Sequence, residues 1–158
     1  MRQPFRTSSG MRYRLLRTTA HDQRWIDQLR RHVYQELFVA TFGSWDEARH
    51  VRQTSECWDR GHISIIEVDG ERVGMVQMFD RTGFVEIGEL QIQPSYQNRG
   101  IGGRILSDIV NQAHKRGKSV KLSVASKNDR ANLFYQRHGF RQVAETETHS
   151  QLECAPEA

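Results

Sequence analysis

The chain has 158 residues, of which 37% are hydrophobic and 27% are charged. This size suits one compact domain with a buried core. No apolar run approaches the ~20 residues that a membrane-spanning helix needs. The net charge of +4 at neutral pH suits a polyanionic partner, either a nucleic acid or a phosphorylated cofactor.

The first ten residues carry charge but lack the apolar stretch of a secretory signal. We expect a flexible lead-in at residues 1–10 and a single domain at residues 11–154. The two cysteines, Cys57 and Cys154, form no motif, which favours a reducing, cytoplasmic compartment. The histidines show no ligand spacing with one another or with the cysteines, so the sequence predicts no metal site.

The first third of the chain predicts one strand and two helices. Residues 13–17 form a short strand. Apolar residues then recur at helical spacing, at Ile26, Leu29, Val33 and Leu37. The run Ser44-Trp45-Asp46-Glu47 has the form of a capping box, with Ser44 as the cap, for a second helix that ends at Gly61.

The rest of the chain alternates strands with helices. Residues 63–68 and 73–79 form a hairpin across Asp69-Gly70, and residues 84–93 form a strand that Pro94 ends. A helix from 101 to Gly117, a strand at 120–125, a helix from Asn128 to Gly139 and one or two final strands follow. A β-α-β connection makes strands 84–93 and 120–125 parallel. The predicted fold class is therefore α/β (α+β), with a mixed, mostly antiparallel sheet flanked by helices.

The glycine turn between strand 84–93 and the following helix is the most informative motif. It reads Gln97-Asn98-Arg99-Gly100-Ile101-Gly102-Gly103. Glycines let a ligand approach the backbone, and the first N–H groups of a helix favour an anion. The spacing excludes a Walker loop, and Ile105 stands where the dinucleotide fingerprint needs its third glycine. The turn is predicted to hold a diphosphate.

Two motifs in this chain resemble those of the Gcn5-related N-acetyltransferases. Gln97-x-x-Gly100-x-Gly102 is similar to that family's acetyl-coenzyme A motif, and Leu90-x-Ile92-x-Pro94-x-Tyr96 looks like its fourth strand. Asn128-x-x-Ala131-x-x-Phe134-Tyr135-x-x-x-Gly139-Phe140 matches a second motif, with Phe in place of Leu. The element order fits as well, so the resemblance covers nearly the whole chain.

The resemblance implies that the central parallel strands splay apart and that acetyl-CoA is the co-substrate. Its pantetheine arm would pair with exposed backbone near Leu90 and Ile92, because opened strands leave N–H and C=O groups that an amide-rich arm can satisfy. The N–H groups of residues 99–103 would take the diphosphate. The cofactor-binding residues implied are Leu90, Ile92, Gln97, Asn98, Arg99, Gly100, Ile101, Gly102, Gly103, Arg104, Asn128 and Tyr135.

The resemblance further implies transfer of an acetyl group to a primary amine, with Tyr135 as general acid toward the sulfur leaving group. Two candidates remain for the base. Glu86 lies eleven residues before Gln97, where some family members carry a catalytic glutamate, and it is the favoured one. Glu89 lies three residues further on, and strand alternation puts the two on opposite faces. Other members carry a glutamate where this chain has Ser123, so that variant mechanism does not transfer.

The alternative function is a non-catalytic acyl-CoA-binding module or a basic nucleic-acid-binding module. A nucleic-acid reader is expected to interleave exposed aromatic and basic residues on one face, and the sequence shows no such pattern. We therefore expect acetyl-CoA and an amine acceptor, either a small molecule or a peptide, as partners, with no nucleic acid and no membrane. An exposed final strand leaves a homodimer open.

Overall fold

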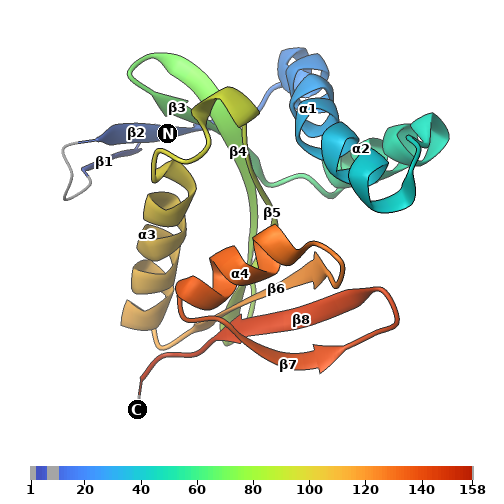
Figure 1. Ribbon diagram of the computed structural model, residues 1–158. Coiled ribbons are helices and arrows are strands. Elements are labelled where there is room, and N and C mark those ends of the chain that lie inside the picture. The colour runs from blue at the N-terminus through green and yellow to red at the C-terminus, as the bar shows by residue number, and fades with distance from the viewer. Residues whose placement is uncertain (1–2, 7–10, 158) are drawn as a thin grey trace. The chain divides into compact units, whose positions relative to one another are not determined.

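The computed structural model describes residues 3–6 and 11–157 (Figure 1). Its strands are hydrogen-bonded in the order β1-β2-β3-β4-β5-β6-β8-β7. The described elements are, in chain order, β1 (Gln3–Arg6), β2 (Arg12–Arg17), the 3₁₀ turn η1 (Ala20–Asp22), α1 (Gln23–Phe42), α2 (Glu47–Arg60), β3 (Ile63–Val68), β4 (Glu71–Asp80), β5 (Phe84–Ile92), the 3₁₀ turn η2 (Pro94–Tyr96), α3 (Ile101–Lys115), β6 (Ser119–Ala125), α4 (Asp129–Arg137), β7 (Arg141–Glu145) and β8 (His149–Cys154).

The chain divides into two compact units, each built from two segments. The first unit comprises Met1–Gln77 and Glu89–Arg99, and the second comprises Met78–Gly88 and Gly100–Ala158. Strands β4 and β5 each begin in one unit and end in the other. The single-domain bounds of 11–154 stay a prediction.

The first unit packs α1 and α2 against antiparallel strands. β2 pairs with β3, and β3 pairs with β4. The apolar spacing that predicted the first helix puts Ile26 and Leu29 in full burial against Ile65 and Met75. Burial of side chains of this size contributes roughly 1.5–3 kcal/mol each, so this contact anchors α1.

The N-terminal lead-in differs from the expectation in part. Gln3–Arg6 form strand β1, antiparallel to β2, while residues 1–2 and 7–10 lie outside the described residues. A strand pairing of this kind rests on backbone hydrogen bonds to an open sheet edge. It therefore leaves no apolar periodicity in the sequence by which it could be predicted.

The start of α2 also differs from the expectation. The capping box with Ser44 as the cap is wrong, because Asp46 is the N-cap residue and its carboxylate accepts a hydrogen bond from the Arg49 N–H at 3.0 Å. Glu47 is engaged elsewhere, accepting from Arg31 and from the Trp45 indole. Glu47 is therefore not available for the reciprocal bond that a capping box requires, and Asp46 caps the helix.

The second unit contains the parallel pair that the sequence predicted. Residues Phe84–Ile87 of β5 pair in parallel with Ser119–Leu122 of β6, and β8 joins β6 and β7 by antiparallel ladders. The inward alternation of β6 and the apolar face of α3, which includes the fully buried Ile105 and Leu106, form its core. The prediction of a mixed, mostly antiparallel sheet is confirmed.

Within the described residues, no helix combines the length and the apolar character that crossing a bilayer requires.

Candidate active site

The turn after β5 is held by the side chain of Gln97. Its Nε2 donates to the Ile92 carbonyl at 2.9 Å, and its backbone N–H donates to the Pro94 carbonyl at 3.2 Å. Asn98 follows with a left-handed φ of 63°. Gln97 therefore fixes the turn to the last residue of β5, a structural role that the motif alone does not reveal.

Helix α3 begins at Gly100, which has a φ of 80° and is its N-cap residue. No side chain caps the helix, and its first intrahelical bond runs from the Arg104 N–H to the Gly100 carbonyl. A Cβ added at Gly100 would meet no atom within 4 Å, so the left-handed φ, and not lack of room, favours glycine here. The Ile101 side chain is buried, so this residue can offer a ligand only its N–H.

Gly103 lies against the imidazole of His138. A Cβ at Gly103 would lie 2.8 Å from His138 Nε2, closer than real Cβ contacts allow. The ring is held on its other side by a 2.8 Å hydrogen bond between Nδ1 and the Phe134 carbonyl. Glycine at position 103 is therefore explained by the packing of α4 on α3, and Gly103 contributes room for the ring as well as an amide.

The second motif places Asn128 and Tyr135 on α4. Asn128 caps the helix, accepting from the Ala131 N–H at 3.1 Å through Oδ1, as predicted. Tyr135 is buried, with edge-on ring contacts to Phe134 and Phe140 at centroid distances of 5.2 and 5.6 Å. Asn128 thus has a structural function in addition to the cofactor contact expected of it.

The last part of β5, which includes Leu90 and Ile92, lies beyond the end of the parallel ladder with β6. The parallel ladder with β6 ends at Ile87, although β5 continues to Ile92. On its β4 side this stretch is tightly packed, because a Cβ at Gly74 would lie 2.2 Å from the Gln91 carbonyl oxygen. The family resemblance predicts that the central parallel strands separate, and the end of the ladder at Ile87 is consistent with that prediction.

The two candidate bases have different surroundings. Glu86 accepts hydrogen bonds from Arg81 at 3.3 and 3.1 Å, and both side chains are partly exposed, at 28% and 45% respectively. Glu89 accepts from Arg30 instead, from Nη2 at 2.7 Å and from Nε at 3.3 Å, with side-chain exposures of 14% and 5%. The family resemblance had favoured Glu86 for its distance from Gln97, but Glu89 is the one in a buried polar environment.

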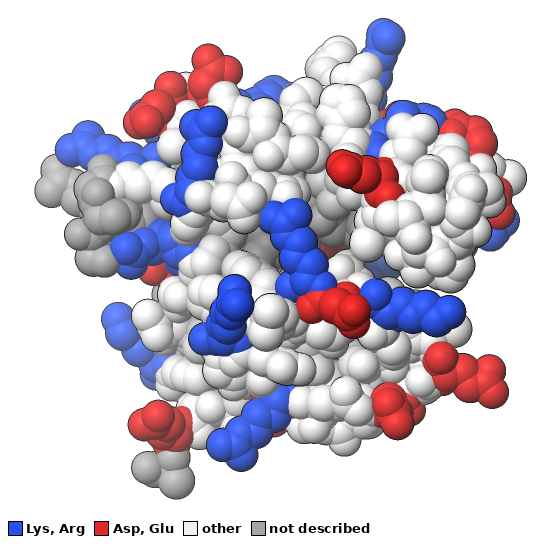
Figure 2. Space-filling model, in the orientation of Figure 1, with Lys and Arg blue, Asp and Glu red and all other residues white. Residues whose placement is uncertain are grey.

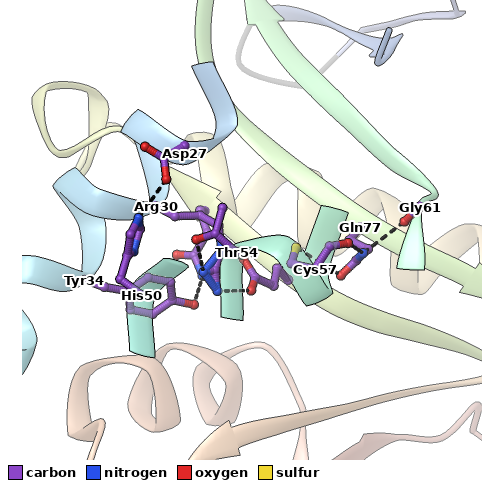
Figure 3. Close-up of polar contacts among 10 residues, drawn as sticks. Asp27, Arg30, Tyr34, His50, Thr54, Cys57, Gly61 and Gln77 are labelled. Carbon is purple, nitrogen blue, oxygen red and sulfur yellow. Dashed lines mark hydrogen bonds and ion pairs between the residues drawn. The ribbon is translucent and has the colours of Figure 1, made fainter. Parts of the chain in front are cut away.

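Burial raises the pKa of Glu89, and the opposing attraction of Arg30 does not fully reverse this. Figure 3 shows the Arg30 guanidinium between Tyr34 and Thr54, with Cys57 and Gln77 further along α2 and β4. Burial raises the pKa of the Cys57 thiol to about 12, so it stays protonated at neutral pH. In this cluster, Glu89 is therefore the acid whose pKa burial moves upward from its ordinary value.

The two arginines expected beside the phosphates are placed differently. Arg99 stacks its guanidinium over the Tyr96 ring at 5.2 Å, and Arg104 is half-buried in the first turn of α3. Basic side chains on the face shown in Figure 2 lie among uncharged and acidic residues.

Among the described residues, no group of three or more His, Cys, Asp or Glu is arranged to hold a metal ion.

A cleft of about 730 Å³ lies in the first unit, between the second half of α1 and the end of β5. Val39, Ala40 and Pro94 give it apolar walls, and Glu36 and His32 add polar ones. Next to it, His32 Nδ1 lies 3.2 Å from Gln93 Oε1. This cleft was not predicted from the sequence, because its lining comes from the outer face of α1 and from the turn after β5.

A family model described as Acetyltransferase (GNAT) family matches residues 30–140, more than half of the chain. The chain belongs to this acetyltransferase family. The family resemblance predicted from the glycine turn and the α4 motif is thereby confirmed.

Curated relatives point the same way. An uncharacterized N-acetyltransferase of Archaeoglobus fulgidus is 32% identical over 91 residues, which are 52% of this chain and 62% of that protein. One of Methanocaldococcus jannaschii is 26% identical over 125 residues, 69% of this chain and 55% of that protein. The chain thus spans about three fifths of the length of these relatives.

Solved structures share the fold at low identity. The PaiA N-acetyltransferase of Thermoplasma acidophilum, crystallised in complex with coenzyme A, has a TM-score of 0.71 at 16% identity, over 90% of this chain and 98% of that one. The ribosomal-protein-S18-alanine N-acetyltransferase of Escherichia coli has a TM-score of 0.65 at 14% identity, over 92% and 96%.

Proposed function

We propose that this protein is an acetyl-CoA-dependent N-acetyltransferase that acts on a primary amine. The observation that carries the proposal is the uncapped N-terminus of α3. It offers backbone N–H groups that no side chain caps, directly after the turn that Gln97 fixes to β5. A diphosphate is the group that such an N-terminus binds well. The PaiA N-acetyltransferase of similar fold was crystallised with coenzyme A.

In our proposal, the cofactor-binding residues are those that the family resemblance implies. Leu90 and Ile92 lie on the part of β5 beyond the parallel ladder, where backbone groups can pair with pantetheine amides. The amides of residues 99–103 would hold the diphosphate, with Arg99 and Arg104 adding positive charge. Bound there, acetyl-CoA supplies an activated acetyl thioester, and the rest of the chemistry falls to protein side chains.

The first task of the protein is to remove a proton from the acceptor. An alkylammonium with a pKa near 10.4 is neutral in only ~0.04% of molecules at pH 7. Glu89 is our candidate for the base, because its carboxylate is held by Arg30 in a buried setting and burial raises its pKa. A base works best when its pKa lies near the working pH. Glu86, paired with Arg81, is the second candidate.

The second task is to protonate the departing sulfur. Tyr135 carries this role in our proposal, because its phenol is fixed in one orientation by Phe134 and Phe140. A general acid that is already oriented spares the reaction the cost of ordering it. Asn128 supports the same helix as its cap.

For the acceptor, we propose a chemical class and not a particular molecule. The cleft bordered by Glu36, Val39 and Pro94 would suit an amine with an apolar stem and a second positive charge. One solved structure of similar fold is named for N-acetylation of an alanine of a ribosomal protein, which makes a peptide N-terminus a further candidate. Cytoplasmic location and a homodimer remain predictions.

The test is a panel of amines and peptides assayed for thiol release from acetyl-CoA, together with thermal unfolding. We expect stabilisation by micromolar acetyl-CoA, since a ligand that binds the native state raises the unfolding temperature. An oligonucleotide of equal charge should give none. Stabilisation by the oligonucleotide alone would favour the nucleic-acid-binding alternative, and acetyl-CoA binding without turnover on any amine would favour a non-catalytic module.

A further inference from the structure

Arg30 is a charged residue on the otherwise apolar face of α1. Its side chain is 5% exposed, and it lies directly after Leu29, which is fully buried. A guanidinium keeps its charge under all ordinary conditions, and burying an ion costs several kcal/mol unless it is well paired. A buried arginine at this position therefore needs a specific partner.

That partner is Glu89, and the pairing uses two points. Arg30 Nη2 lies 2.7 Å from Oε1 and Nε lies 3.3 Å from Oε2, so the guanidinium approaches the carboxylate side-on. A two-point pair fixes the plane of the carboxylate as well as its position. Both carboxylate oxygens therefore accept a bond from Arg30, and hydrogen bonds from the Cys57 and Gln91 side chains add to the hold on the carboxylate.

Arg30 is itself held on two further sides. Nη1 donates to the Thr54 hydroxyl on α2 at 3.3 Å, and the guanidinium lies over the Tyr34 ring at 5.0 Å (Figure 3). Tyr34 in turn accepts a hydrogen bond from Gln91 of β5. The pair is therefore braced from both helices, and the carboxylate has little freedom to turn.

Three alternate residues contact α1, two in the last part of β5 and one directly after the strand. Glu89 contacts Arg30, Gln91 donates to Tyr34, and Gln93 lies within hydrogen-bond distance of His32. Residues at i, i+2 and i+4 share one face of a strand. The first unit thus holds the Glu89 face of β5 by polar contacts, while Leu90 and Ile92 belong to the opposite face.

We propose that Arg30 is a positioning residue for acetyl transfer, which holds the Glu89 carboxylate in one orientation and in its anionic form as the base toward the acceptor amine. This inference rests on the proposed function. The charged or titratable groups that face Glu89 are Arg30 on α1 and Cys57 and Arg60 on α2. The thiol is protonated at neutral pH, so the two arginines set the local charge.

The test measures kcat/KM against pH for the wild type, Arg30→Lys, Arg30→Met and the control Arg31→Met. Arg31 lies on the same helix and pairs with Glu47 at the surface. A base must be anionic, and without Arg30 the buried carboxylate protonates at higher pH. We expect the acidic limb of Arg30→Met to move upward by about one pH unit, which costs up to roughly tenfold in rate at pH values below the limb.

Arg30→Lys keeps a cation and guards against loss of the fold. An ammonium is a point charge and cannot hold both carboxylate oxygens in a plane. We expect kcat to fall roughly 3- to 10-fold, with KM for acetyl-CoA unchanged. The limb should move less than in Arg30→Met.

Three results would overturn the inference: a folded Arg30→Met with an unmoved limb, an equal loss at every pH, or an Arg30→Lys enzyme identical to the wild type. Arg31→Met should keep the wild-type profile. An equal shift in this control would mean that the loss of any positive charge from α1, and not the contact with Glu89, causes the effect. A wild-type protein without activity on any amine refutes the proposed function instead. The two failures are therefore distinguishable.

Discussion

Strand β5 carries two glutamates three residues apart, each paired with an arginine, and the pairs differ in kind. Glu86 and Arg81 form an ion pair at the surface, within a hairpin of the second unit. Glu89 and Arg30 form theirs within the first unit, where both side chains are mostly withdrawn from water. Solvent screens the attraction within an exposed pair, so the pair contributes little to stability. Within a buried pair, the attraction is stronger and affects both the charge state and the orientation of the two side chains. Burial, rather than residue type or spacing, is what separates a candidate base from a surface charge.

The largest expected effect is on turnover when each glutamate is neutralised. Glu89→Gln removes the proposed base, so kcat/KM should fall by ~10²-fold or more, while Glu86→Gln should stay within about threefold because its pair is exposed. Thiol release measures both variants, and circular dichroism verifies their folding. The reverse order of effects would give the role to Glu86, as the sequence spacing favoured.

Tyr135→Phe extends the comparison to the other proton transfer. We expect at least a tenfold loss of turnover, with acetyl-CoA binding retained because the ring and its aromatic neighbours remain. The substitution should alter the alkaline limb of the profile of kcat/KM against pH, whereas substitutions at Arg30 should alter the acidic limb. Full activity in Tyr135→Phe would remove the phenol from the mechanism.

The same contrast should appear in stability. Arg30→Met leaves Glu89 buried without its cation, and breaking a buried pair of this kind costs about 3–5 kcal/mol. Arg81→Met breaks a surface pair and should cost less than about 1 kcal/mol. Urea unfolding of both variants compares the two values directly. Equal losses would mean that the buried pair is no more important to the fold than the exposed one.

The smallest effects concern the pH dependence of stability, where two carboxylates should act in opposite directions. Burial raises the pKa of Glu89, so its contribution to stability is present at acid pH and is lost as pH rises above the ordinary range for Glu, ~4.3. For Asp22, burial is outweighed by hydrogen bonds from the Thr19 N–H and from Arg72, so its pKa is lowered. Its contribution is present above the ordinary Asp range and is lost as pH falls.

Urea midpoints between pH 3 and pH 8 test this pair of slopes. Glu89→Gln should remove a loss of stability on the alkaline side of that range, and Asp22→Asn should remove a loss on the acidic side. Identical midpoint-against-pH curves for the two variants would contradict both signs.

Much of the framework was predictable from sequence because it depends on local patterns. Helical and alternating apolar residues gave the central elements, and Asn128 capped α4 as expected. The parallel relation of β5 and β6 followed from the connection between them. These features need only near neighbours in the chain, so the sequence contains them.

What escaped prediction depends on distant partners. Arg30 belongs to the apolar stripe of α1, and a charge within such a stripe is the signal that could have flagged it, but its partner Glu89 is 59 residues away. The contact of His138 with Gly103 and the close approach of Gly74 to Gln91 are likewise tertiary. The family motif ranked Glu86 above Glu89 by its distance from Gln97, and that distance carries no information on burial.

Both cysteines of the chain are buried, and burial raises the pKa of Cys57 to about 12 and also raises that of Cys154. Since the thiolate is the reactive form, neither sulfur should react readily with aromatic disulfide reagents while the protein is native. A colorimetric reading of free coenzyme A can therefore be made on the unmodified enzyme, with little background from the protein's own sulfhydryls.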